Sequence, residues 1–125
     1  MRLLLDTHTL LWWLDDADRL GPVARRAISA RGNLVVVSAA SAWEIAIKRA
    51  SGKLTGGEEL SSAVEAEGFV PLSINFDHAA EAGALPRHHA DPFDRMLVAQ
   101  ARIERLVIVT ADPRISRYEV ETLAA

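Results

Sequence analysis

The sequence contains no cysteine among its 125 residues. Disulfide bonds and thiolate metal sites are therefore excluded, and any catalytic or metal-binding chemistry must use oxygen and imidazole groups. The absence of cysteine also fits a reducing compartment.

The chain has no basic excess either. Its 14 Lys and Arg residues against 17 Asp and Glu residues give a net charge of -3. This argues against strong sequence-independent binding to nucleic acid, because contacts with phosphates normally require surplus positive charge. Two features limit the argument: bound divalent ions would change the local sign, and basic residues cluster at Arg25-Arg26 and at Lys48-Arg49 with Lys53.

Long apolar runs are also missing. The stretch 3–14 is hydrophobic, but Asp6 and His8 interrupt it, and neither a small-residue cleavage site nor an apolar span of about 20 residues follows. We therefore expect a cytoplasmic protein without a membrane partner. With 50% hydrophobic residues, the chain is long enough for one domain with a core and too short for two, so residues 1–125 are expected to form a single domain.

Apolar strand patterns alternate with helical patterns along the chain. Unbroken apolar runs such as 34–37 and 106–109 are typical of parallel strands covered on both faces. The run 69–74 contains Pro71, which predicts an edge position because proline lacks the N–H that a central strand needs. The alternation predicts a three-layer α/β/α sandwich with a parallel central sheet. The expected strands are 2–6, 34–37, 69–74 and 106–109, the expected helices are 7–14, 23–31, 41–50, 57–67, 75–83 and 91–104, and the tail from Ser116 is left unassigned.

Four acidic residues stand in apolar surroundings. Asp6 and Asp112 follow the first and the last apolar strands, and Glu44 and Asp94 lie near the starts of apolar helices. The carboxyl ends of parallel strands meet at one edge of a sheet, where ligands usually bind, so we expect the acids to converge there. Unpaired negative charges gathered in this way would be costly, and a bound cation is the natural remedy.

Each acid also has a purely structural explanation. Asp6 could cap the helix that follows it, and Asp112 could form an ordinary turn with the proline after it. Ser41 and Glu44 fit a capping box, and Glu44 could pair with Lys48 at i,i+4 spacing. Four independent caps, however, would have no reason to lie beside one sheet edge, whereas a metal site requires it.

Four segments are informative together: 3–8 (LLLDTH), 38–48 (SAASAWEIAIK) with 52–54 (GKL), 91–101 (DPFDRMLVAQA) and 109–112 (VTAD). In this order and at this spacing they resemble the PIN domain, and specifically the VapC-type toxins of bacterial type II toxin–antitoxin systems. The resemblance extends from the first strand to about residue 116.

The resemblance implies a PIN-like α/β domain with the activity of an Mg²⁺- or Mn²⁺-dependent endoribonuclease, which hydrolyses phosphodiester bonds in RNA such as tRNA or rRNA. It also implies a homodimer and a cognate VapB-type antitoxin, a segment of which fills the active-site groove. Ile115 replaces a further acid that many members carry, which leaves the number of metal ions open. The family's catalytic and metal-binding acids match Asp6, Glu44, Asp94 and Asp112, and its neighbouring hydroxyl positions match Thr7 and Thr110.

The segment 91–94 offers two acids. We assign the metal-binding role to Asp94, because it leads directly into the apolar helix, and we expect Asp91 to cap that helix. Arg87, Arg95 and Arg102 could hold RNA phosphates near the site, although solvated surface arginines are the alternative for each.

His88 and His89 are adjacent and, with Asp91, offer the ligand types of a zinc site. Adjacent side chains point apart in most backbones, so we do not expect zinc there. The three tryptophans could stack on bases, but their places in apolar helical patterns favour packing in the core or at a dimer interface.

Three other interpretations compete. A phosphoacceptor receiver domain would have paired acids after its first strand and a late lysine, whereas the lysines here are Lys48 and Lys53. A haloacid-dehalogenase-type phosphatase would have an acid two residues after Asp6, where His8 stands. The serious alternative is a catalytically inactive PIN-like module that acts by binding proteins. The presence of all four acids counts against it, and stabilisation by Mn²⁺ or Mg²⁺ would discriminate.

Overall fold

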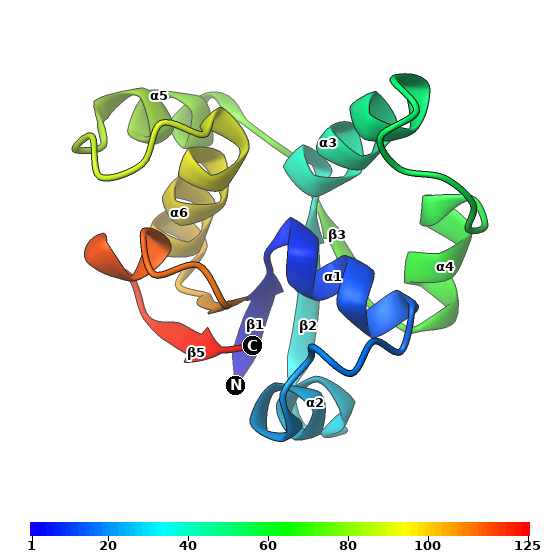
Figure 1. The fold of residues 1–125 in the computed structure, drawn as a ribbon. Helices are drawn as coiled ribbons and strands as arrows, with labels where there is room; N and C mark the ends of the chain where they lie inside the picture. The colour runs from blue at the N-terminus through cyan, green and yellow to red at the C-terminus, as the bar shows by residue number, and fades with distance from the viewer.

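The computed structural model describes residues 1–125 and contains a five-stranded sheet in the order β3-β2-β1-β4-β5, in which every neighbouring pair is parallel. Helices flank the sheet, which confirms the predicted α/β architecture (Figure 1). The strands are β1 (Arg2–Leu5), β2 (Leu34–Ser38), β3 (Val70–Leu72), β4 (Val107–Thr110) and β5 (Thr122–Ala124). The α-helices are α1 (Thr7–Leu14), α2 (Pro22–Ser29), α3 (Ala39–Ala50), α4 (Leu60–Ala66), α5 (Phe76–Ala84) and α6 (Pro92–Glu104), and a short 3₁₀ helix, η1, spans Ile115–Arg117.

Alternate residues of β1 enter two different cores, one on each face of the sheet. Leu3 and Leu5 pack with residues of α1, α2, α3 and α4, whereas Leu4 packs with residues of α6 (Figure 1). All three leucines are completely buried. Because β1 is covered on both faces from Leu3 onward, residues 3–5 are all apolar, and the next polar side chain stands where the strand ends, at Asp6.

The two edges of the sheet differ in how well the sequence predicts them. β3 lies at one edge and contains Pro71, as expected. The other edge is β5, which lies in the tail left unassigned above because its residues are few and partly polar. β5 is defined by its neighbour: Ile108 to Thr110 of β4 pair in register with Thr122 to Ala124.

Two helices begin more than one residue away from the predicted start. α3 starts at Ala39 and not at Ser41, because the side chain of Ser38 caps it by accepting a hydrogen bond from the backbone N–H of Ala40. The capping box of Ser41 with Glu44 is therefore wrong, and Glu44 lies in the second turn of α3. α4 covers Leu60–Ala66 and not 57–67; Gly56 and Gly57 before it have φ angles of 76° and 84°, which are incompatible with a right-handed helix.

All helices of the structure are too short or too polar to cross a membrane.

Candidate active site

The parallel arrangement brings the ends of β1 and β4 side by side. The backbone N–H of Asp6 donates to the carbonyl of Val109 over 3.2 Å, so the residue after β1 is joined directly to β4. The side chain of Asp6 accepts a hydrogen bond of 2.8 Å from the N–H of Thr9, and the residue is only 3% exposed. Asp6 is thus the cap of α1, as its structural explanation proposed, and it also lies at the predicted sheet edge.

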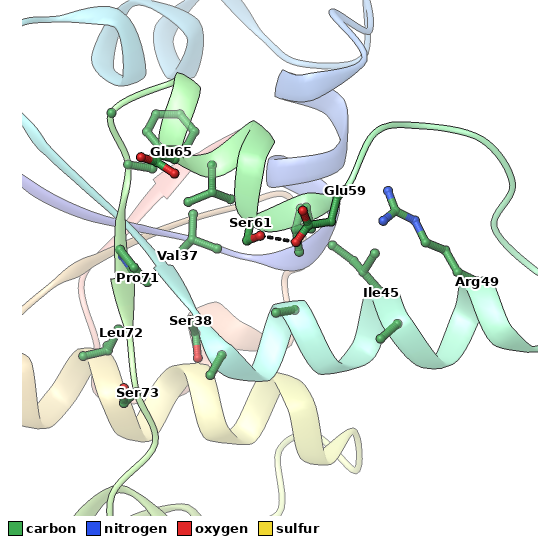
Figure 2. A pocket seen from close by; sticks show the side chains of 17 residues that line it. Val37, Ser38, Ile45, Arg49, Glu59, Ser61, Glu65, Pro71, Leu72 and Ser73 are labelled. Carbon is green, nitrogen blue, oxygen red and sulfur yellow. Dashed lines mark hydrogen bonds between the residues drawn. The ribbon is translucent and has the colours of Figure 1, made fainter.

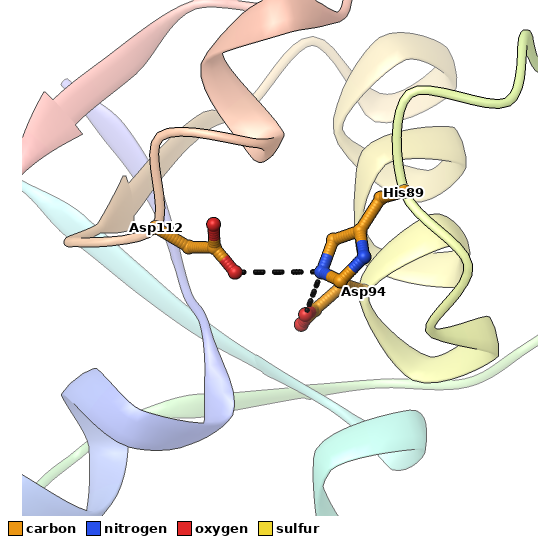
Figure 3. Close-up of side chains that lie close together, drawn as sticks. All are labelled: His89, Asp94 and Asp112. Carbon is orange, nitrogen blue, oxygen red and sulfur yellow. Dashed lines mark hydrogen bonds and ion pairs between the residues drawn. The ribbon is translucent and has the colours of Figure 1, made fainter.

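A compact cluster forms between α6 and the loop after β4. The Nε2 atom of His89 lies 2.9 Å from Oδ2 of Asp94 and 3.4 Å from Oδ2 of Asp112 (Figure 3). One ligand atom from each of the three residues lies within 4.8 Å of the other two, close enough to share a metal ion. We call these three residues the acidic-histidine cluster.

Within the acidic-histidine cluster, the ionised form of Asp94 is disfavoured. The pKa of Asp94 is raised to about 6, mainly by burial and also by the charges of Asp91 and Asp6, while His89 acts in the opposite direction. The involvement of Asp6 places its carboxylate within reach of Asp94. At neutral pH this region therefore carries more negative charge than its own side chains neutralise, which favours a bound cation.

Asp112 differs from Asp94 in its surroundings. Burial acts to raise the pKa of Asp112, but hydrogen bonds from the side chain and backbone of Arg114 outweigh it and hold the pKa below its ordinary value. Asp112 is therefore ionised over a wide pH range and is already partly neutralised by a cation of the protein itself.

Glu44 is buried, at 7% exposure, and its carboxylate lies 3.0 Å from Nζ of Lys48. The i,i+4 pair is thus confirmed. The carboxylates of Glu44 and Asp6 do not join the acidic-histidine cluster within the 4.8 Å that its three members share. The structure brings Asp94 and Asp112 together, places Asp6 within electrostatic reach, and gives Glu44 a lysine partner.

Both predicted hydroxyl groups are hydrogen-bonded within the protein. Thr7 donates to Oγ of Ser41 over 3.0 Å and so joins the start of α1 to α3. The Oγ1 atom of Thr110 accepts a 3.0 Å hydrogen bond from the N–H of Asp112, which orients the first residues after β4. Each threonine therefore helps to position an element that carries a site acid.

Asp91 is the cap of α6, as expected: its carboxylate accepts hydrogen bonds from the N–H groups of Phe93 and Asp94.

Arg95 donates to the carbonyls of Ala82, Leu85, Pro86 and His89 and to the hydroxyl of Tyr118.

The contacts of Arg95 show that its guanidinium ties the loop between α5 and α6 to the start of α6. Arg102 pairs with Glu81 and donates to the carbonyl of Glu119. Both arginines are therefore occupied by the protein itself. Arg87 is exposed and has no such partner, so binding of RNA phosphates is retained as a prediction for this residue alone.

Sequence reasoning missed His89. The adjacent histidines do point apart: the ring of His88 packs edge-on against Tyr118 at 5.0 Å, while His89 is buried and faces the acids. The zinc-type site considered from the sequence, with His88 and His89 beside Asp91, does not form. A usable signal was the position of His89 in the short loop before α6, five residues ahead of Asp94.

Trp43 is 62% exposed and does not pack in the core, so that part of the expectation is wrong for this residue, while packing at a dimer interface stays a prediction. Its ring meets that of Phe93 edge-on at 5.2 Å. Trp12 and Trp13 do pack against the buried core on the α1 face, as expected.

A large cavity lies away from the acids. It has a volume of about 740 Å³ and is formed by α3, α4 and the segment around β3, with a mostly apolar lining that includes Val37, Ile45 and Phe69 (Figure 2). None of the four predicted acids lines it. This cavity is therefore separate from the site of acid-dependent chemistry.

The donor set at the sheet edge fits a hard divalent cation. Carboxylate oxygens are the preferred ligands of Mg²⁺ and Mn²⁺. Asp94 and Asp112 offer such oxygens within 4.8 Å of each other, close enough to share one ion. The pKa of Asp94 is raised mainly by burial and in part by the charges of Asp91 and Asp6, so a cation bound there would favour its ionised form.

Comparison with known proteins agrees with this geometry. Residues 3–121 match the family model described as the PIN domain. The chain is 33% identical over 123 residues to ribonuclease VapC22 of Mycobacterium tuberculosis, covering 92% of this chain and 90% of that protein.

Among solved structures, the fold is similar to a chain of VapBC2 from Rickettsia felis bound to a DNA fragment from its promoter, with a TM-score of 0.73, 14% identity and coverage of 98% of both chains. It is also similar to a chain of DNA-bound VapBC from Salmonella typhimurium, with a TM-score of 0.71, 17% identity and coverage of 98% of this chain and 97% of that one. The family match spans nearly the whole sequence and includes every strand end that carries a site acid. The chain belongs to the PIN domain family.

Proposed function

We propose that this protein is a ribonuclease toxin of the VapC type that uses a divalent cation, Mg²⁺ or Mn²⁺. The observation that carries the proposal is the partly buried carboxyl of Asp94, which faces Asp112 across His89 and whose pKa is raised to about 6 by burial and by neighbouring acids. The similarity to ribonuclease VapC22 over most of both chains supports the RNA-cleaving activity.

Asp94 and Asp112 would hold the cation, with Asp6 and Glu44 completing the negative site directly or through water. When bound, the cation supplies Lewis-acid polarisation of the scissile phosphate and a water molecule of lowered pKa. Asp6 keeps a fixed orientation because the N–H of Thr9 binds one of its oxygens. Lys48 holds the carboxylate of Glu44 in a defined direction. No side chain forms a covalent intermediate in this proposal.

The substrate that we propose is RNA, with tRNA or rRNA as the expected class, and the active form is a homodimer. A VapB-type antitoxin would inhibit the enzyme by covering the acidic edge of the sheet. The toxin–antitoxin complexes among the structural neighbours support such a partner.

The test is cleavage of total cellular RNA by the purified, antitoxin-free chain, with Mg²⁺ or Mn²⁺ and with EDTA. We expect discrete metal-dependent products that disappear in Asp94→Asn. Asp18→Asn is the matched control, because Asp18 is an exposed acid in the turn between α1 and α2. Cleavage that persists in Asp94→Asn, or that survives EDTA, would refute the assignment.

An inactive protein-binding module is the remaining alternative. Thermal unfolding with and without Mn²⁺ separates it from a metalloenzyme, since a ligand at 100 times its Kd stabilises the folded state by about 2.7 kcal/mol. Stabilisation without RNA cleavage would indicate that the substrate is missing from the assay, whereas no stabilisation would favour the inactive module.

A further inference from the structure

His89 is held more firmly than its place in a loop suggests. Its side chain is only 5% exposed. Its backbone N–H donates to the hydroxyl of Tyr118 over 3.0 Å, and Arg95 donates to its carbonyl and to other carbonyls of the same loop. The imidazole ring therefore enters the acidic site in one orientation, which the start of α6 and the region of η1 define together.

The hydrogen bonds of the ring determine where its proton lies. Nδ1 accepts a hydrogen bond of 3.3 Å from the backbone N–H of Asp91. An acceptor nitrogen carries no proton, so in the neutral ring the proton is on Nε2. Nε2 is the atom that faces Oδ2 of Asp94 at 2.9 Å and Oδ2 of Asp112 at 3.4 Å (Figure 3).

We infer that His89 is a positioning residue of the active site: its Nε2–H donates to Asp94 and fixes that carboxylate for the cation, and His89 does not bind the cation itself. This inference rests on the proposed metal-dependent function. It adds to that function a residue outside the four acids and limits the protein ligands to oxygen.

The alternative, in which Nε2 binds the cation, would require the proton to move to Nδ1. Nδ1–H would then face the N–H of Asp91, and the hydrogen bond between them would be lost. The hydrogen bond from Nε2–H to the carboxylate of Asp94 would be lost as well, and both losses oppose the change. Mg²⁺ and Mn²⁺ offer little in return, because they prefer oxygen to imidazole nitrogen.

The first experiment reads the proton of His89 directly. Two-dimensional ¹⁵N–¹H NMR of the imidazole distinguishes the two neutral forms, and Mg²⁺ is diamagnetic, so spectra can be compared before and after saturation. We expect the Nε2–H form in both. His78, whose Nδ1 also accepts a backbone N–H, is an internal reference for that form. A proton on Nδ1 in the Mg²⁺-bound protein would overturn the inference.

The second experiment measures Mg²⁺ affinity by calorimetry in three variants. His89→Gln keeps a side-chain N–H donor and should bind Mg²⁺ within about threefold of the unmodified chain, whereas His89→Ala should lose about 10- to 100-fold. His88→Ala is the matched control, because His88 packs on Tyr118 and not on the acids. Equal losses in His89→Gln and His89→Ala would contradict a donor role.

Neither readout depends on RNA cleavage. If RNA cleavage persists in Asp94→Asn or in EDTA while Mg²⁺ binds and His89 behaves as expected, the proposed function fails and the positioning role stands. If RNA is cleaved but the proton is found on Nδ1, the positioning role fails and the proposed function stands.

Discussion

The molecule contains two buried histidines with almost the same hydrogen-bond pattern. His78 accepts a backbone N–H on Nδ1 and faces Glu104 through Nε2 at 3.0 Å; His89 accepts a backbone N–H on Nδ1 and faces Asp94 through Nε2 at 2.9 Å. The first pair belongs to a capping box at the start of α5 and joins α5 to the end of α6. The second pair lies at the opposite end of α6, at the sheet edge.

The difference between the two pairs lies in their neighbours. Glu104 faces only His78 and is one-third exposed. Asp94 is partly buried and lies near the charges of Asp91 and Asp6, which together disfavour its ionised form, and it shares His89 with Asp112. A histidine–carboxylate pair is therefore structural when it stands alone and becomes a candidate functional site when the topology adds further acids to it.

The largest expected effect concerns the carboxylates of the two pairs. Asp94→Asn should reduce RNA cleavage by at least about 100-fold, because metal-based charge stabilisation is worth several kcal/mol, whereas Glu104→Gln should leave cleavage within about twofold. Initial rates on a mapped RNA substrate, normalised to folded protein, provide the measurement. Similar losses in both variants would show that the two pairs do not differ in the way we describe.

The second prediction concerns the histidines and stability. His78→Ala should lower the free energy of unfolding by about 2–4 kcal/mol, because it removes a fully buried side chain, one half of a capping box and the link to Glu104. Urea denaturation measures the loss. Mg²⁺ affinity of the folded His78→Ala protein should be unchanged; a weaker affinity would couple the two histidines, against our interpretation.

The third prediction concerns pH. The pKa of Asp94 is raised in the folded state, so ionisation of this carboxyl destabilises the metal-free fold at pH values above about 6, and the penalty disappears as the pH falls below the ordinary pKa of an aspartate, about 3.9. Asp94→Asn should therefore stabilise the metal-free chain by on the order of 2 kcal/mol near pH 8 and by much less near pH 4.

Denaturant titrations of both proteins across this pH range in EDTA would check the third prediction. Saturating Mg²⁺ should stabilise the unmodified chain more than Asp94→Asn. A variant that is less stable than the parent at every pH would mean that Asp94 is a favourable charge in the metal-free fold.

The smallest expected effect comes from replacing Arg114, which lies outside the acidic-histidine cluster. Arg114 lies on the surface and lowers the pKa of Asp112 through hydrogen bonds. Arg114→Gln should raise that pKa, as followed by carboxyl ¹³C NMR, and should alter overall stability little, because exposed ion pairs contribute little. Arg117→Gln is the matched control on η1. An unchanged pKa of Asp112 would indicate that other groups set its ionisation.

Much of the fold follows from local sequence. The apolar runs at Leu3–Leu5 and Val107–Val109 become central strands because side chains covered on both faces must be apolar. Pro71 becomes an edge residue and Asp91 a helix cap for equally local reasons, namely a missing N–H and a short acceptor side chain. β5 was not predicted, because its formation as a strand depends on pairing with β4 and not on a pattern in its own residues.

The candidate site was predictable in part. The positions of Asp6, Asp94 and Asp112 after strands or before a helix indicate the shared edge, since parallel strands end together. The partner of Glu44 was also within reach, because Lys48 is one helical turn away. The hydrogen bonds from Arg95 to loop carbonyls could not be predicted, because those acceptors come into position only when the loop has folded over α6.

Patterns of apolar and polar residues in the chain are sufficient for the strands, most helices and the edge at which the acids meet, because those depend on periodicity and on the geometry of parallel sheets. They are not sufficient to assign roles to chemically identical residues. His78 and His89 have the same side chain and nearly the same local contacts, and their different surroundings arise from packing between distant segments. It is the convergence of β1, α6 and the loop after β4 that places several carboxylates around one histidine and leaves the other with a single carboxylate.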